Sequence, residues 1–320
     1  MSKRLFIFDS DGGVDDAQAL ILLVANGRVP DIITTVFGNV GLDQATTNLL
    51  AVQAMLGTKT PVHKGADRPM VQPIIDAKYV HGDDGLGGAR RPATQDLPAS
   101  NDGVGVLRST FREAAAKGEK VDILMIGPLT NLALALVLEP QIIDGIGTLT
   151  IMGGNVYGRG NTTPAAEFNI YADPEAAHVV LTAGIETVVI PWEPCTTHFM
   201  EGERVDALFA AIPESPLKHF SHALAVHARD NGVRRGNPDR MLYVDPLAAA
   251  VLIDPSMVKK SIFASSSVAL APGLTRGMTL VDPSGRLGTP KITFVEEVDT
   301  GKVDRLYAVS AAYSPKTTTT

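Results

Sequence analysis

Four aspartates lie within eight residues near the start of the chain, in the stretch Asp9-Ser-Asp11-Gly-Gly-Val-Asp15-Asp16. Carboxylates held this close repel one another, so a positive charge is needed to offset them. A hard cation such as Ca²⁺ or Mg²⁺, which prefers oxygen ligands, meets this need. The alternative is a helix N-terminus that carries acids, where Asp15 and Asp16 interact favourably with the helix dipole. Four acids with two glycines favour the metal site.

The elements around this loop alternate between strands and helices. Apolar runs predict strands over 4–8, 32–37, 121–126, 149–152, 186–190, 290–295 and 305–309. Helical spacing, Asp-Pro starts and an N-cap at Asp173 predict helices over 15–25, 44–56, 128–138 and 173–182, and one more from Asp245. We therefore expect an α/β fold with a single open, mostly parallel sheet flanked by helices and a Rossmann-like core. In such sheets, ligands bind beyond the carboxyl ends of the strands, where the polar clusters of this chain fall.

Composition limits the possible partners. The 320 residues carry 28 Lys and Arg against 35 Asp and Glu, and this acidic balance argues against a nucleic-acid or anionic membrane partner. The single cysteine, Cys195, excludes an internal disulfide framework. No apolar run is long enough to span a membrane, and no signal-peptide region is apparent. We expect one cytoplasmic domain over residues 1–315 and a disordered tail over 316–320.

The opening loop has two possible relatives. The string Phe8-Asp-Ser-Asp-Gly12 resembles the nucleophile loop of haloacid-dehalogenase-type phosphatases. That family also needs a downstream lysine and a late pair of acids. Here the pair Asp83-Asp84 comes too early, and no suitable lysine loop follows.

The stronger resemblance is to the inosine–uridine-preferring nucleoside hydrolases, whose opening motif is D-T-D-P-G-x-D-D-A. This chain has Asp9-Ser-Asp-Gly-Gly-Val-Asp-Asp-Ala17, with Gly12 in place of the usual proline. Further matches follow in chain order at Phe37–Asn39, His81–Gly87, Ile126–Asn131, Met152–Asn155, Pro164–Ala177 and Val244–Pro246. Together they identify the chain as a member of that family, with its nucleoside hydrolase fold.

The resemblance implies hydrolysis of the N-glycosidic bond of ribonucleosides, giving ribose and a free nucleobase. It also implies a bound Ca²⁺, held by Asp11, Asp16, Asp245 and the main-chain carbonyl of Ile126, with Asp11 as general base for the metal-bound water. Asp245 has a second interpretation, as a cap of its helix. Family members are commonly homodimers or homotetramers.

The remaining site residues implied by the resemblance bind the sugar. Asp15 and Asn169 are expected at the ribose 2′- and 3′-hydroxyls, with Asn39 close by. The other predicted substrate-binding residues are Asn161 and Glu167 at the 5′-hydroxyl, with Met152 and Phe168 beside them.

The part of the site that faces the base departs from the family pattern. Many members place a histidine before the last metal aspartate as leaving-group acid, but this chain has Val244, which has no proton to donate. His81 and His227 are the candidate acids, and we favour His227 because Arg229 and Asp230 follow it. A calcium-dependent nucleoside-binding protein without catalysis is the alternative function, although the intact Asp11 argues against it.

Overall fold

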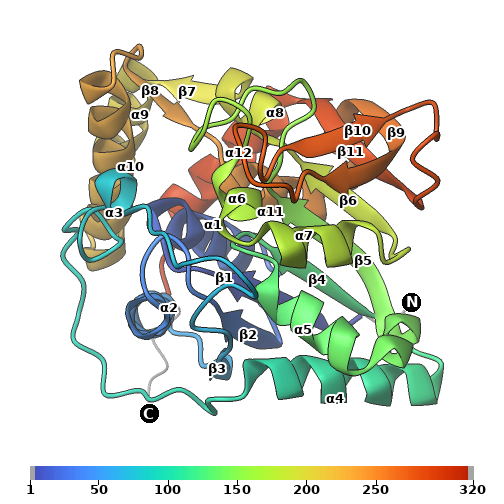
Figure 1. Cartoon of the computed structure of the whole chain (residues 1–320). Helices are drawn as coiled ribbons and strands as arrows, with labels where there is room; N and C mark the ends of the chain where they lie inside the picture. Colours follow the sequence, from blue (N-terminus) through green and yellow to red (C-terminus); the bar gives the residue numbers. More distant parts are fainter. Residues whose placement is uncertain (1–3, 316–320) are drawn as a thin grey trace.

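A nine-stranded sheet forms the centre of the molecule, with its strands in the order β10-β9-β11-β6-β5-β4-β1-β2-β3 (Figure 1). The computed structural model describes residues 4–315, so the tail predicted over 316–320 lies outside the described residues. Strands pair in parallel from β3 across to β11, and β9 pairs antiparallel with both β10 and β11. The sheet consists of β1 (Phe6–Ser10), β2 (Ile32–Thr35), β3 (Val62–Lys64), β4 (Val121–Met125), β5 (Ile146–Met152), β6 (Thr187–Ile190), β9 (Val258–Val268), β10 (Thr279–Asp282) and β11 (Lys291–Val298).

Helices cover both faces of the sheet because its strands are apolar on both sides. Phe6 and Phe8 of β1 pack into one core with α1, α10, α11 and α12, whereas Ile7 between them joins a second core with α4, α5 and α7. Figure 1 shows α4, α5 and α7 together on one side. The helices are α1 (Val14–Ala25), α2 (Leu42–Leu56), α3 (Lys78–His81), α4 (Gly103–Lys117), α5 (Thr130–Leu138), α6 (Phe168–Ala172), α7 (Pro174–Leu181), α8 (Trp192–Thr197), α9 (Gly202–Ala210), α10 (Pro216–Arg234), α11 (Asp245–Ile253) and α12 (Thr300–Ala311), with 3₁₀ turns η1 (Pro140–Gly145) and η2 (Pro255–Met257).

The predicted α/β fold with a mostly parallel sheet flanked by helices is confirmed. Asp173 caps α7 as expected, since its side chain accepts a hydrogen bond from the Ala176 amide at 3.1 Å. Several boundaries differ by a few residues. For example, α5 begins at Thr130, so Pro128 precedes the helix, and Asp245 is the first residue of α11 rather than its cap.

The strand predicted over 305–309 is wrong. These residues lie inside α12, whose N-cap Asp299 accepts a hydrogen bond from the Lys302 amide. Val303, Tyr307 and Ala311 are buried at intervals of four residues, which is the spacing of one helix face. The apolar run over 305–309 is too short to show this four-residue spacing, so it was interpreted as a strand.

The carboxyl ends of the central parallel strands meet at one edge of the sheet, and loops from β1, β2, β4, β5 and β6 leave from it. A two-stranded sheet of β7 (Phe199–Glu201) and β8 (Arg240–Leu242) leads into α11. No helix within residues 4–315 combines the length and apolar character needed to cross a membrane.

Candidate active site

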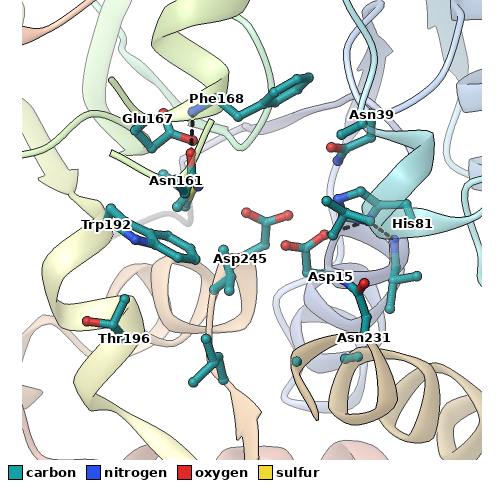
Figure 2. A pocket seen from close by; sticks show the side chains of 18 of the residues that line it. Asp15, Asn39, His81, Asn161, Glu167, Phe168, Trp192, Thr196, Asn231 and Asp245 are labelled. Carbon is teal, nitrogen blue, oxygen red and sulfur yellow. Dashed lines mark hydrogen bonds and ion pairs between the residues drawn. The ribbon is translucent and has the colours of Figure 1, made fainter. Parts of the chain in front are cut away.

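A cavity of about 480 Å³ opens at this edge of the sheet, within the range of small-molecule sites (Figure 2). Residues from all seven of the matched sequence segments line it, although the first and the last are more than 200 positions apart in the chain. They include Asp15, Asn39, His81, Ile126, Met152, Asn161, Glu167, Phe168, Asn169, His227 and Asp245. Asp11 and Asp16 do not line the cavity, and both are fully buried.

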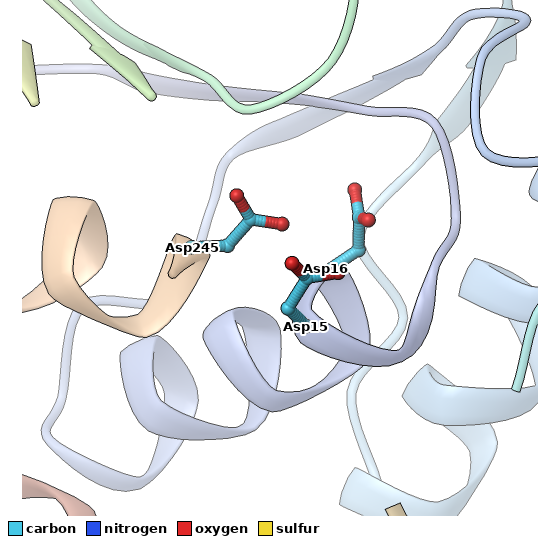
Figure 3. Close-up of side chains that lie close together, drawn as sticks. All are labelled: Asp15, Asp16 and Asp245. Atoms are coloured by element: carbon cyan, nitrogen blue, oxygen red, sulfur yellow. The ribbon is translucent and has the colours of Figure 1, made fainter. Parts of the chain in front are cut away.

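Three carboxylates meet at the floor of the cavity. Asp15 and Asp16 start α1, Asp245 starts α11, and one oxygen from each lies within 4.8 Å of the others (Figure 3). Burial raises the pKa of Asp15 to about 6, and burial together with the charge of Asp15 raises that of Asp245 well above its usual range. Burial therefore opposes a negative charge on both carboxylates, and at Asp245 the charge of Asp15 adds to this effect.

The donor set fits a hard divalent ion. Asp15 Oδ1 is buried without a hydrogen-bond partner, so its lone pairs are free to serve as a ligand. Asp16 is held by the Ser10 hydroxyl at 2.6 Å and the Gly13 amide at 2.8 Å, which fix its orientation. Ile126 lines the same cavity, and its carbonyl accepts a hydrogen bond from the Asn169 side chain at 3.1 Å. All donors are oxygens, the preference of Ca²⁺ and Mg²⁺.

Asp11 is held by Asn39. Asn39 binds both of its oxygens, through the main-chain amide and through the side-chain amide, each at 2.8 Å. The Asp11 amide donates to Asp16 Oδ1 at 3.1 Å, so Asp11 lies next to the carboxylate cluster but is not part of it. Burial, and then the charge of Asp16, raise the pKa of Asp11 well above its usual range.

Gly12 shapes this loop. Its φ is +73°, and a Cβ there would lie 2.5 Å from the Ala45 Cα on α2. Only glycine adopts such a backbone readily, and only glycine leaves room for α2. The departure from the family's proline therefore comes with a specific local conformation.

Two of the predicted sugar-binding residues, Asn161 and Glu167, lie across the cavity from Asp15 and Asn39 (Figure 2). Glu167 caps α6 by accepting from the Asn169 amide at 2.9 Å, and it also accepts from the Gly154 amide at 2.9 Å. Burial nevertheless raises the pKa of Glu167 to about 7. The Asn169 side chain donates to the carbonyls of Ile126 and Met152, each at 3.1 Å, which fixes its amide beside the cavity. Asn161 accepts from the Phe168 amide at 2.8 Å.

The two candidate histidines differ in their bonding. The Val14 amide donates to His81 Nδ1 at 3.1 Å, so the proton of the neutral ring is on Nε2. Burial lowers the pKa of His81 to about 4, and its ring lines the cavity beside Asp15 (Figure 2). His227 Nε2 lies 2.8 Å from the Val80 carbonyl. Val244 also lines the cavity.

The comparisons agree with this geometry. The family model described as inosine-uridine preferring nucleoside hydrolase matches residues 6–305. The chain belongs to the inosine–uridine-preferring nucleoside hydrolase family. The non-specific ribonucleoside hydrolase RihC of Salmonella paratyphi B is similar to this nucleoside hydrolase, with 34% identity over 286 residues that cover 89% of each chain.

Solved nucleoside hydrolases share the fold. The plant nucleoside hydrolase PpNRh1 superposes with a TM-score of 0.89 at 27% identity, over 97% of this chain and 99% of that one. An inosine-guanosine nucleoside hydrolase superposes with a TM-score of 0.87 at 26% identity, over 98% of this chain and all of that one. This nucleoside hydrolase is therefore an enzyme, and its resemblance to phosphatases ends with the opening loop.

Several polar groups that line the cavity of this nucleoside hydrolase were not predicted. They are Tyr79, Thr196, Asn231, Arg235, Asn237 and Arg240. Asn231 lies on α10, which extends to Arg234, and Arg235 follows directly. Continuing the helix from the histidine segment to Arg234 would have brought both residues to the cavity.

Proposed function

We propose that this nucleoside hydrolase uses Ca²⁺ to cleave the N-glycosidic bond of ribonucleosides. The observation that supports this most directly is the buried carboxylate cluster, which shares one cavity with Glu167 and Asn169. A nucleoside placed there has hydroxyl donors and acceptors for the polar wall and for the ion.

The residues divide into two groups. Asp16, Asp245 and the Ile126 carbonyl would hold the ion with Asp11, as the family resemblance implies, and Asp15 lies close enough to share it. When bound, the ion lowers the pKa of a water and orients the ribose hydroxyls. Asp11 accepts the proton of the attacking water, and Asn39, bound to both oxygens of Asp11, holds the base in place.

The leaving group needs a hydrogen-bond donor, because the electron pair of the broken C1′–N bond moves onto the base. His81 supplies one in this proposal, since the Val14 amide fixes its proton on Nε2. The C1′–N bond breaks, a C1′–O bond forms to water, and the base leaves with the electron pair.

A panel of purine and pyrimidine ribonucleosides tests the function. We expect base release, followed by absorbance, with an equal amount of ribose measured as reducing sugar. EDTA is expected to abolish it, and Ca²⁺ to restore it, with about one Ca²⁺ per chain in the purified enzyme. Tight nucleoside binding without release would support the binding-protein alternative, and zinc in the active enzyme would contradict the ligand assignment.

We also propose one domain over residues 1–315, a cytoplasmic location and a homodimer or homotetramer. The family resemblance supports the assembly, and sedimentation of the purified chain measures it. A monomer at micromolar concentration would contradict it.

A further inference from the structure

We propose that His227 is a positioning residue that ties α10 to the segment Tyr79–Gly87, which carries His81. In this role His227 holds two walls of the base end together and donates no proton to the leaving base. The activity measurements below rest on the proposed function, whereas the exchange measurement does not.

The first contact is a directed hydrogen bond. His227 Nε2 lies 2.8 Å from the Val80 carbonyl oxygen. A carbonyl accepts only, so Nε2 carries the proton and donates it to the main chain. The bond holds the residue immediately before His81, so any movement of α10 is passed to the His81 ring.

The second contact lies on the other side of the ring. A Cβ placed on Gly87 would lie 2.2 Å from His227 Cγ and 2.5 Å from His227 Nδ1. The backbone of Gly87 therefore packs directly against the imidazole and covers its Nδ1 side. Gly87 is itself tied to the same segment, because its amide donates to the His81 carbonyl at 2.8 Å.

The third contact joins the same two elements at the rim of the cavity. The Arg235 guanidinium, at the C-terminal end of α10, lies 5.0 Å from the centre of the Tyr79 ring. Cation–π contacts at exposed sites are weak individually. Here it adds to the hydrogen bond and the close packing contact described above. All three contacts fall within the nine residues Tyr79–Gly87, so α10 and this segment move together.

A conservative variant separates the two roles of His227. In His227→Gln, the amide Nε2 is as many bonds from the backbone as the imidazole Nε2, so it still donates to Val80, but it has no titratable proton. We expect His227→Gln to keep kcat/KM for inosine within about threefold. We expect His227→Ala to lose about tenfold on inosine and on p-nitrophenyl riboside alike, mainly through KM.

Amide hydrogen exchange of the unliganded holoenzyme tests the hydrogen bond from His227 to Val80 without a measurement of activity. Loss of one net hydrogen bond predicts about threefold to tenfold faster exchange of amides in residues 78–88 of His227→Ala. His227→Gln is expected to exchange like the native chain. Amides of β1 serve as the internal reference.

Two neighbouring glycines give a matched pair. Gly87→Ala and Gly88→Ala introduce the same backbone strain, since φ is +62° and +73°, but no atom lies within 4 Å of a Cβ on Gly88. We expect Gly87→Ala to reproduce His227→Ala, to add little to it in the double variant, and Gly88→Ala to leave exchange over 78–88 much closer to native.

Two results would overturn the proposal. One is a loss of about 100-fold on inosine in both His227→Gln and His227→Ala with p-nitrophenyl riboside unaffected, which would make His227 the acid. The other is unchanged exchange over residues 78–88 in His227→Ala. If the native enzyme releases no base from any nucleoside, the proposed function fails, and the exchange data alone decide the role of His227.

Discussion

Replacing His81 with alanine tests how the leaving base is stabilised. His81 Nδ1 accepts a hydrogen bond from the Val14 amide, which leaves Nε2–H as the donor on the ring that lines the cavity. Because burial lowers its pKa to about 4, His81 is neutral above about pH 5 and donates a hydrogen bond without carrying a charge. His81→Ala removes that donor and leaves the Val14 amide without its acceptor.

The two effects differ in size. Removing one fixed donor from a developing anion lowers kcat by about 10² to 10³. An unpaired buried amide costs about 1–3 kcal/mol of folding stability. Water from the cavity can reach the Val14 amide once the ring is gone, so we expect the lower limit, a fall in Tm of about 2 °C in a chain of this size.

The assay compares inosine or uridine with p-nitrophenyl riboside, whose phenolate leaves without a donor. His81→Ala is expected to lose its activity on the nucleosides and to keep most of its activity on p-nitrophenyl riboside. His178→Ala is a matched control, since this half-buried histidine on α7 contacts Ser267 at 3.3 Å and does not line the cavity.

The dependence of kcat/KM on pH can refute the assignment of His81 as a neutral donor. A neutral donor predicts no loss of kcat/KM as pH rises through 6.5. A fall there that disappears in His81→Ala would show an imidazolium acid and contradict the reasoning, as would equal losses on both substrates.

Three further predictions concern the acids. Asp11→Ala is expected to lower kcat by about 10² to 10⁴, and near-normal turnover with metal bound would exclude it as the base. Glu167→Gln is expected to lower kcat/KM by roughly tenfold to a hundredfold, and 5′-deoxynucleosides should suffer less if it binds the 5′-hydroxyl. In the metal-free protein, burial raises the pKa of Asp9 and Glu167 to about 7 and that of Asp15 to about 6. The folded chain then holds protons that the unfolded chain releases, so stability falls as pH rises from about 4 to 7. Among these groups only His81 makes stability rise with pH, between about pH 4 and 6.5, because its pKa is lowered on folding. We therefore expect the Tm in EDTA to be higher at pH 6 than at pH 8. A Tm that rises from pH 6 to pH 8 would contradict this prediction.

The sequence was enough to predict the fold and most of the cavity because parallel strands end at one edge. Asp15, Ile126 and Asp245 are far apart in the chain, yet each follows an apolar run that becomes a strand or leads from one. Motifs that follow successive strands therefore meet in space. The family resemblance implied Glu167 and Asn169 for the same site, and both line the cavity.

What the sequence did not predict depends on side-chain direction. Asp11 turns both oxygens to Asn39, and Asp15 lies with Asp16 and Asp245 in the carboxylate cluster, an arrangement that spacing along one loop does not determine. The bond from His227 to the Val80 carbonyl links residues 147 positions apart. Such a contact becomes visible only when α10 and the α3 segment are packed together.

Gly12 has a consequence for how this loop can change. Proline fixes φ near −65°, whereas Gly12 is at +73° with α2 against it at Ala45. Restoring the family's proline in this chain would therefore require a new backbone path through residues 11–13 and more room at α2. A substitution of Gly12 by proline therefore depends on two coupled changes, one in the backbone path and one in the position of α2. A consensus design that altered Gly12 alone would misplace Asp11 and Asp16.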